Sequence, residues 1–371
     1  MFILENPITG KQFEIPRRKA REVFAVSGGV KKFMCMPVSV DSKVESSLNV
    51  PVVRVEETKF YQKKKVGGTC VIRMGGIGDL IILSSSLREL KRRSDKPVIL
   101  ATLKSNVSFM ESFGFLNRVI SIEDVDRYRF DNVIDLRFAT EPPQMGSICR
   151  GKWEDYILKD RSDVFDELVG VYPAPKRFEL PSVKKEIENM KEAVKYPFIL
   201  LNCSMVSAAR SIIPKYVKPL CLKILKWGAT VVLTGTSQPW NTFLKEISKT
   251  GVVNLIDKTT PPELIALCSL ANFVVTPDTG TLHIAGALGK RTIGLFGAIQ
   301  PRTRVSYYPN VRALYPQGVL PCIPCHDLHK CMGSPEKGSK CMRLFTPDVI
   351  MVAIEQEMKG VRNVPIKEMV C

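Results

Sequence analysis

The chain has 371 residues, 45% of them hydrophobic and 25% charged, which is typical of a globular protein large enough for two domains. No apolar run approaches the ~18 residues of a membrane span, and the opening residues show no signal-peptide pattern, so we expect a cytoplasmic protein. The net charge of +17 favours a polyanionic partner, which is a nucleic acid, an anionic membrane face or a phosphorylated substrate.

Residues 1–66 read as a basic N-terminal extension. The opening ILENPITGKQFEIP predicts a hairpin that turns at Thr9-Gly10. The segment holds thirteen Lys or Arg and seven Asp or Glu. A docking arm for an anionic surface is one interpretation, and a solvated, partly ordered extension is the favoured one.

Residues 67–185 are expected to form a first Rossmann-like domain. An apolar strand (TCVIR) leads through a glycine-rich turn into an amphipathic helix with Leu80, Leu83, Leu87 and Leu90 on one face. KPVILATL, RVISI and NVIDLR follow as strands with short helical stretches between them. This alternation predicts a parallel sheet covered on both faces, and PAPKRFELPSV reads as the interdomain connection.

A second alternating series begins at YPFILLN and predicts a C-terminal Rossmann-like domain over residues 186–345, which includes a Cys-rich loop at 321–341. Residues 346–371 are expected to form a helix that packs back across the domain interface, with Thr346 as N-cap and Pro347 at the first helical position. The fold class is therefore α/β, with two doubly wound domains that face each other across a cleft. Ligands of such folds bind at the carboxyl ends of the strands.

The turn after the first strand of residues 67–185 contains Gly75, Gly76 and Gly78, followed by Asp79 at the helix start. Glycines let the backbone approach another molecule closely, although the spacing is not the GxGxxG of dinucleotide-binding folds. Asp79 is interpreted as a general base that faces the cleft. The alternative is a carboxylate that only favours the positive end of the helix.

A second strand, turn and helix lies at residues 273–296. Strand Phe273–Val275 is followed by Asp278, Thr279, Gly280 and Thr281, then by a helix whose first turn contains His283. Backbone N–H groups, a glycine and a helix N-terminus at one point suit a diphosphate. An ordinary β-α-β turn with a core histidine is the alternative.

IRMGGIGDLIILSSSLRELK and VVTPDTGTLHIAGALGKRTIGLFG together resemble glycosyltransferase family 9, the lipopolysaccharide heptosyltransferase family. The resemblance covers roughly Thr69 to the C-terminus. It implies a GT-B fold and an inverting, metal-independent transfer of a sugar, usually from ADP-heptose. The C-terminal domain would hold the diphosphate at Thr279, Gly280 and Thr281 beside His283. The domain at residues 67–185 would bind the acceptor, and its Asp79 would deprotonate the acceptor hydroxyl.

The family also places a basic residue in the loop after the first strand of the C-terminal domain, usually ahead of a Trp-Pro pair. Arg210 is the nearest equivalent and Lys215 is a competitor, because Ile213 replaces the tryptophan before Pro214. The acidic residue that commonly follows the next strand is absent from LTGTSQPW. Arg302 and Arg304 are predicted to point to the same cleft end, with a solvated loop as the alternative.

Among the eleven cysteines, two groups are distinguished by their position in the sequence. Cys70, Cys203, Cys221 and Cys268 lie in apolar segments and are expected to be core thiols. A cluster of four in the Cys-rich loop suits a structural Zn²⁺ site without a catalytic role, with four reduced thiols as the main alternative and an iron–sulfur cluster as another. Its members are Cys322, Cys325, Cys331 and Cys341, and His326 or His329 could replace one thiolate.

The first functional hypothesis is a sugar transferase whose acceptor is lipopolysaccharide or another phosphorylated glycolipid, reached by peripheral association with the inner membrane face. No cofactor is required for this chemistry. The second keeps the reaction and changes the acceptor to a nucleic acid or a protein, although closely spaced aromatics for base stacking are few. The third is a binding protein that has the fold without the catalysis.

Overall fold

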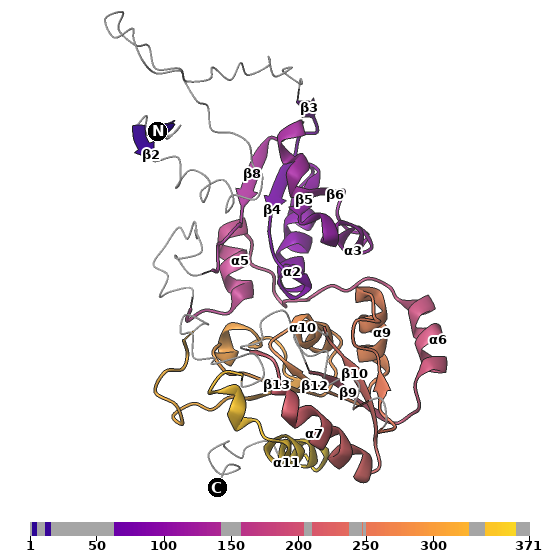
Figure 1. The fold of residues 1–371 in the computed structure, drawn as a ribbon. Coiled ribbons are helices and arrows are strands. Elements are labelled where there is room, and N and C mark those ends of the chain that lie inside the picture. The colour runs from indigo at the N-terminus through magenta and orange to yellow at the C-terminus, as the bar shows by residue number, and fades with distance from the viewer. Residues whose placement is uncertain are drawn as a thin grey trace, which may run out of the picture. The chain divides into compact units, whose positions relative to one another are not determined.

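The computed structural model describes residues 2–5 and 12–15 by their backbone, and residues 63–141, 157–203, 210–236, 247, 250–325 and 338–360 (Figure 1). The chain divides into two compact units, Met1–Lys63 and Lys64–Cys371. In the first unit, strand β1 (Phe2–Glu5) pairs antiparallel with β2 (Gln12–Ile15), with Phe2 opposite Ile15. This pairing confirms the predicted hairpin, whose turn lies outside the described residues.

The N-terminal half of the second unit contains a four-stranded parallel sheet in the order β6-β5-β4-β8. Two further short strands of this half, β3 and β7, pair in parallel with each other and form a separate two-stranded sheet. The strands are β3 (Lys64–Lys65), β4 (Thr69–Ile72), β5 (Val98–Thr102), β6 (Arg118–Ser121), β7 (Tyr128–Arg129) and β8 (Asn132–Asp135). The helices are α2 (Ile77–Arg93), α3 (Val107–Glu111) and α5 (Arg161–Val169), with 3₁₀ turns η1 (Lys104–Asn106) and η2 (Ile122–Arg127).

The C-terminal half contains a six-stranded parallel sheet in the order β11-β10-β9-β12-β13-β14. Its strands are β9 (Phe198–Asn202), β10 (Thr230–Thr234), β11 (Val253–Asn254), β12 (Phe273–Pro277), β13 (Thr292–Leu295) and β14 (Val311–Leu314). Its helices are α6 (Lys184–Ala193), α7 (Pro214–Lys226), α9 (Pro261–Leu270), α10 (Gly280–Ala287) and α11 (Pro347–Met358), with 3₁₀ turns η5 (Pro301–Thr303) and η6 (Met342–Leu344). In both sheets the strand order reverses direction beside the first strand, which is the doubly wound pattern expected from the sequence.

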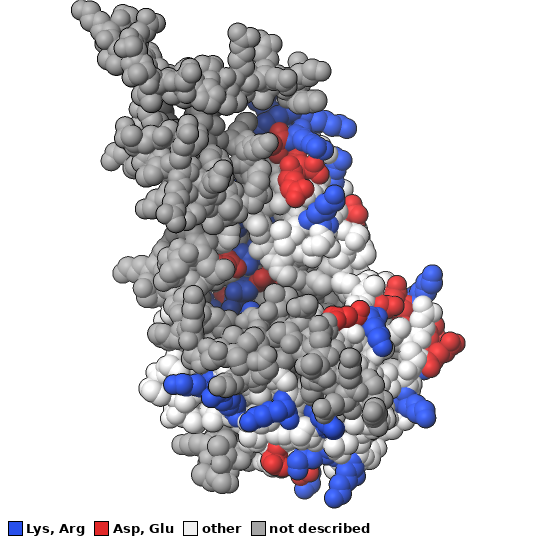
Figure 2. Space-filling view, viewed as in Figure 1, with Lys and Arg blue, Asp and Glu red and all other residues white. Residues whose placement is uncertain are grey.

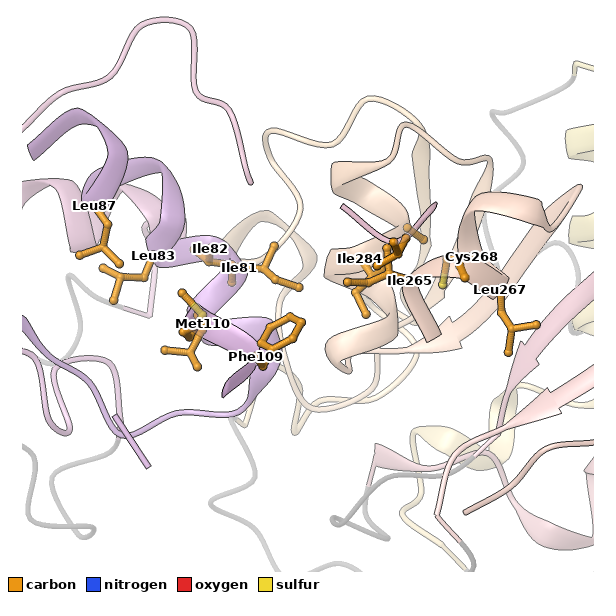
Figure 3. Packing of buried hydrophobic residues seen from close by; sticks show 14 of the residues in the cluster. Ile81, Ile82, Leu83, Leu87, Phe109, Met110, Ile265, Leu267, Cys268 and Ile284 are labelled. Atoms are coloured by element: carbon orange, nitrogen blue, oxygen red, sulfur yellow. The ribbon is translucent and has the colours of Figure 1, made fainter. Parts of the chain in front are cut away.

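The central strands β5, β9 and β12 are buried along their whole length, so the side chains that alternate between the two faces of each sheet are covered on both sides. In β9, Leu200 belongs to one hydrophobic cluster, whereas Ile199 and Leu201 belong to another on the opposite face, together with α7 and α11. The first of these clusters continues from β9 through α9 and α10 into α2 and α3. Figure 3 shows this continuity, with Ile81 and Phe109 on one side and Ile284 and Ile265 on the other. The two halves therefore share one apolar core.

Several helix ends follow their sequence signals. The Thr260 hydroxyl accepts from Glu263 N–H, and the Glu263 carboxylate accepts from Thr260 N–H, so α9 begins with a capping box. Thr346 caps α11 as predicted, with its hydroxyl 3.4 Å from Val349 N. The core thiols Cys70, Cys203, Cys221 and Cys268 are buried as expected.

The structure adds two features to the sequence analysis. Strand β14 extends the sheet beyond the last predicted strand, and α11 packs on α7 within the C-terminal half, because Ile350 and Ile354 enter the same cluster as Leu220 and Ile224. Residues 361–371, which complete the segment expected to cross the interface, lie outside the described residues. The described helices include none that is both long and apolar enough to cross a bilayer.

Candidate functional site

The glycine-rich turn after β4 places Asp79 in the first turn of α2. Gly76 is the N-cap and makes no side-chain cap hydrogen bond. A Cβ built on Gly75 would lie 2.7 Å from the Asp79 Cβ and 2.9 Å from its Oδ2, whereas one on Gly76 would meet nothing within 4 Å. Gly75 thus leaves room for the Asp79 carboxylate, and Gly76 is open on its outer side.

The turn after β12 builds the second part of the site, at the start of α10. Thr279 is the N-cap, and its hydroxyl accepts from Thr281 N–H at 3.2 Å and lies 3.0 Å from the Thr276 hydroxyl. Asn202, at the end of β9, donates from Nδ2 to the Thr281 hydroxyl at 2.6 Å. Because β9 and β12 are neighbours on which the strand order reverses, this is the topological switch point of the sheet.

The two turns meet where α2 packs on α10, and Figure 1 shows these two helices next to each other. A Cβ on Gly78 would lie 2.7 Å from His283 Cδ2 and 3.4 Å from Gly280 Cα. Only glycine leaves space for this approach, so Gly78 sets the distance between the helices. The sequence analysis expected the two motifs to face each other across a cleft, and the structure brings them into direct contact at this point.

Two arginines hold the Asp79 carboxylate. Arg161, the first residue of α5, donates from Nη1 to Asp79 Oδ1. The fully buried Arg73 lies with Nη2 3.4 Å from the same oxygen and donates to Leu136 O at 2.9 Å and to Glu141 Oε1 at 2.7 Å. Asp79 is therefore a charged acceptor in a part-buried ion network, with its side chain 17% exposed.

Asp278 has a corresponding set of basic neighbours. Its Oδ2 lies 3.2 Å from Arg210 Nη1 and 3.6 Å from Arg304 Nε, and its Oδ1 lies 3.7 Å from His283 Nε2. The buried carboxylate is surrounded by two guanidinium groups and one imidazole, which come from three segments of the C-terminal half. A carboxylate in this position orients these cations, and it would repel a diphosphate that touched it directly.

A hydrogen bond between the halves brings the two sets of arginines near each other. Asp160, the N-cap of α5, accepts from Ser306 N–H at 3.2 Å with its Oδ2. The loop that contains Arg304 is thereby tied to the helix that contains Arg161. Four arginines and three carboxylates consequently form one cluster, which consists of Arg73, Arg161, Arg210, Arg304, Asp79, Asp278 and Glu141. We call these seven residues the arginine cluster.

The arginine cluster changes the acidity of its members. Burial alone would raise the pKa of Asp79, but Arg161, Arg73 and Arg304 outweigh it and hold this pKa well below its usual range. Burial also opposes ionisation of Asp278, and contacts with His283, Arg304 and Arg210 lower its pKa in the same way. Burial and the nearby Arg161 lower the pKa of Arg304 to about 10, against the pull of Asp278 and Asp79.

These shifts describe a site that is short of negative charge. Four guanidinium groups face three carboxylates, and the pKa of Arg304 is lowered by its burial and, to a smaller extent, by the nearby Arg161. Within the described part of the chain, the buried Nε atoms of Arg73 and Arg161 and the Nδ1 of His283 lack hydrogen-bond partners. A bound anion with several oxygens would satisfy such donors and relieve the repulsion.

The predicted residues are thus brought together to different extents. Asp79, Gly78, Gly280 and His283 meet at the contact of α2 and α10. Of the two basic candidates after β9, Arg210 contacts Asp278, whereas Lys215 is exposed with its Nζ 5.4 Å from the Tyr216 ring centroid. Arg304 belongs to the arginine cluster, and Arg302 is exposed.

The sequence analysis did not identify Arg73, Arg161 or Glu141 as site residues. Arg73 precedes the glycine-rich turn and is six residues before Asp79, and this closeness in the sequence was the available signal. Arg161 is 82 residues from Asp79 in the sequence, in a region without a recognisable motif. Asp160, which is a favourable N-cap, was the only local sign that Arg161 begins a helix.

The cysteines of the Cys-rich loop are described in part. Cys322 and Cys325 are partly buried, and Cys341 is buried with its Sγ 3.2 Å from the Ser339 hydroxyl. Among the described residues, no three Cys, His, Asp or Glu side chains are grouped closely enough to hold a metal ion. The fourth cysteine, Cys331, and both histidines of the loop lie outside the described residues, so the described thiols do not form the predicted site by themselves.

Burial, with the thiols of Cys325 and Cys341 nearby, raises the pKa of Tyr315 to about 12. Two of the clustered cysteines are therefore near the phenol of the half-buried Tyr315. Cys341 also packs tightly on the chain, because a Cβ on Gly297 would lie 2.6 Å from its Sγ. This packing fixes one of the four predicted ligands next to the end of β13.

Residues 150–332 match the family model of glycosyltransferase family 9 (heptosyltransferase), a segment that includes Arg210, Asp278 and His283 and begins after Asp79. No curated protein matches the chain by sequence. The confirmed resemblance is to the family that the two sequence motifs indicated.

Solved structures share the fold at low sequence identity. A family 9 glycosyltransferase from Veillonella parvula has a TM-score of 0.59 at 12% identity, covering 81% of this chain and 98% of that one. The E. coli ADP-heptose lps heptosyltransferase II has a TM-score of 0.58 at 16% identity, covering 79% and 98%. The iron-containing heptosyltransferase TibC, solved with ADP-D-beta-D-heptose, has a TM-score of 0.59 at 12% identity, covering 81% and 78%. Residues 150–332 therefore match glycosyltransferase family 9, and the chain is a glycosyltransferase with the parallel α/β fold of these solved structures.

Proposed function

We propose that the protein transfers a heptose-like sugar from a nucleoside diphosphate sugar to an acceptor hydroxyl in one inverting, metal-independent step. The observation that carries this proposal is the position of Asp79, which lies in the arginine cluster beside the N-terminus of α10. A proton acceptor and a group of anion-binding donors are both needed for such a transfer, and here they occupy one site.

The donor diphosphate would bind between α10 and the arginines. Gly280, the first residue of α10, has an N–H group without a partner inside the helix, as do the first N–H groups of any helix. The Thr281 N–H is taken by the Thr279 hydroxyl, so it is not available as the resemblance implied. Arg210 and Arg304, oriented by Asp278, would supply the positive charge.

In the reaction, the acceptor oxygen would attack the anomeric carbon while its proton moves to the Asp79 carboxylate. The bond between the anomeric carbon and the diphosphate oxygen would break on the opposite side, and the nucleoside diphosphate would leave with the bonding electrons. The guanidinium groups would stabilise the charge that develops on the leaving oxygen. Fixed cations can do this without a metal ion.

Arg161 must loosen its hold on Asp79 for this step, because a carboxylate with a strongly lowered pKa is a weak base. A diphosphate that binds Arg161 and Arg304 would compete with Asp79 for both cations and would raise the pKa of Asp79. Donor binding would in this way prepare the base. The buried Nε of Arg161, which lacks a partner among the described residues, supports its role as a ligand donor.

The proposed donor is ADP-heptose, and the proposed acceptor is lipopolysaccharide or another phosphorylated glycolipid. The family description and the printed names of the E. coli enzyme and of TibC support the donor. The net charge of +17 supports an anionic acceptor and peripheral binding at the inner membrane face. In Figure 2, Lys and Arg predominate over Asp and Glu on the visible face around α7, which carries Lys215, Lys218, Lys223 and Lys226.

The test compares Asp79→Asn with Asp348→Asn, a change of the same kind in the first turn of α11. Release of ADP from ADP-heptose in the presence of acceptor is measured, together with ADP affinity by calorimetry. We expect Asp79→Asn to lower kcat by about 100-fold or more, the usual contribution of a general base, while ADP still binds. Asp348→Asn should match the parent. Full activity of Asp79→Asn would refute the assignment, and a parent without turnover on any nucleotide sugar would indicate a binding protein.

A further inference from the structure

A cavity with charged side chains around it lies at the C-terminal end of α2, on a different side of the helix from the core. It has a volume of about 390 Å³ and is lined by Ser85, Arg88, Glu89, Lys91, Arg92, Phe115, Pro173, Pro175 and Arg177. Ser85, Arg88, Glu89 and Arg92 are spaced three or four residues apart, so they share one helix face. Figure 3 shows Leu83 and Leu87 of the same helix in the apolar core instead.

The cavity has more positive than negative charge. Arg92 is held by Glu89 through two hydrogen bonds of 2.8 Å, and Arg88 pairs with Glu179 at 3.1 Å. The remaining cations, Lys91 and Arg177, form no ion pair with another described residue. Two positive charges from separate segments of the chain therefore face the cavity without a counter-charge.

A buried hydroxyl lies in the same wall. Ser85 is 3% exposed, and its Oγ has no hydrogen-bond partner within the described residues. Leaving such a group unpaired costs stability, and a ligand oxygen placed against this wall would satisfy it. The neighbouring Ser84 and Ser86 hydroxyls, in contrast, are satisfied by the Ile81 carbonyl and by the Asp166 carboxylate.

Stabilisation of the negative C-terminal end of α2 by basic residues does not explain why Arg177 and Ser85 line this cavity. Basic residues in the last turn stabilise the negative end of a helix, which accounts for Lys91 and Arg92. Arg177 belongs to the segment between α5 and α6, and Ser85 lies two turns before the end of α2. Neither contributes to the capping of α2, yet both line the same space.

We propose that this cavity binds a phosphomonoester carried by a small ring-bearing molecule such as a sugar. A phosphomonoester has a charge of about −1.5 to −2 at pH 7 and three acceptor oxygens, which matches two unpaired cations and one hydroxyl. A carboxylate would neutralise only one of the cations. Phe115, over which Arg88 lies at 5.7 Å from the ring centroid, and the two prolines supply an apolar wall for the ring.

The site is separate from the arginine cluster. Ser85 and Arg88 follow Asp79 by six and nine residues, or about 9 and 13.5 Å along the helix axis. The proposal thus stands on the cavity itself and does not depend on the proposed transfer reaction. The phosphate can belong to a soluble sugar phosphate or to a lipid headgroup, and the experiment distinguishes these two sources.

The full-length protein is titrated calorimetrically with glucose 6-phosphate, and glucose is the neutral control. In a second arm, sedimentation is measured with phosphatidylcholine vesicles with and without phosphatidic acid. We expect Lys91→Ala/Arg177→Ala to weaken phosphate-dependent binding by about tenfold or more. The matched control is Lys184→Ala/Lys185→Ala, which removes two exposed charges from α6 and should match the parent.

Ser85→Ala tests the buried hydroxyl independently. It removes an unpaired polar atom, so the protein should be as stable as the parent while affinity falls about 2- to 10-fold. Binding of glucose 6-phosphate assigns the cavity to soluble phosphates, and binding only to phosphatidic acid vesicles assigns it to a lipid headgroup. The proposal is overturned if neither probe binds, or if binding is equal in the parent and in Lys91→Ala/Arg177→Ala.

Discussion

Replacing Gly78 by alanine tests whether α2 and α10 meet as described. The new Cβ would lie 2.7 Å from His283 Cδ2, and ordinary contacts begin at 3.4 Å, so the imidazole must withdraw by about 0.7 Å, the difference between these distances. Overpacking of this kind costs about 1–3 kcal/mol. Alanine regains about 1 kcal/mol of helix propensity, so the net loss of stability should reach about 2 kcal/mol.

Gly76→Ala is the matched control. Gly76 has φ −72° and an alanine there would meet nothing within 4 Å, so no clash is introduced. The lower entropy of the unfolded chain, about 0.4–1 kcal/mol, roughly offsets the weaker N-cap. We expect its free energy of unfolding to stay within about 0.5 kcal/mol of the parent.

Urea denaturation gives the stabilities, and ADP affinity and turnover give the effect on the site. Because a shift of about 1 Å in an active site can cost about 100-fold in rate, Gly78→Ala should lower turnover by about tenfold or more. Adding His283→Ala should remove the clash and restore part of the stability in a double-mutant cycle. If Gly78→Ala and Gly76→Ala have the same stability and turnover, the contact between α2 and α10 does not exist as described.

Three further predictions test charge and metal binding. Arg161→Gln removes the nearest cation from Asp79, so the acid limb of the pH–rate profile should move upward by about 1 to 3 pH units, and an unmoved limb would contradict the role of Arg161. Because the folded-state pKa of Asp278 is below the ~3.9 of an unfolded chain, its stabilisation should be present above pH ~4 and lost as pH falls further; urea denaturation of Asp278→Asn should show a smaller loss over this range, and a loss equal to that of the parent would refute this. Elemental analysis of the purified protein should find bound zinc, and the zinc content should decrease when Cys331 is replaced by Ser. Protein purified without any metal would refute the zinc site, and protein purified with iron in place of zinc would show that the site binds iron.

The strands and principal helices could be predicted because their periodicity is local. Val71, Leu100 and Leu200 lie in runs of apolar residues that only a sheet buried on both faces accommodates. The two turns at Asp79 and Asp278 could be placed at the ends of strands for the same reason. Strand β14 was missed because VRAL is short and mostly half-buried, and its pairing with β13 supplies what its sequence lacks.

The arginine cluster could be predicted only in part. Asp79, Asp278 and Arg210, with the neighbouring His283, were identified from the sequence. Asp278 was grouped with the turn that would bind the diphosphate, whereas its contacts make it the partner of the basic residues. Arg161 could not be found, because its neighbours in space come from segments far away in the sequence. An ion pair leaves no periodic signal in the chain, since it needs one residue on each side and no particular spacing.

The sequence by itself determined the two parallel sheets and the turns that contain Asp79 and Asp278. It also determined which residue types are available as a base and as anion-binding groups. All of these depend on neighbours within a few residues of the chain. Only the tertiary structure decided that Gly78 contacts His283, that Arg161 holds Asp79 and that Ser85 faces a cavity with Lys91 and Arg177. The reason is that charge interaction and close packing depend on distance in space, and that distance is set by how the shared core joins the two halves.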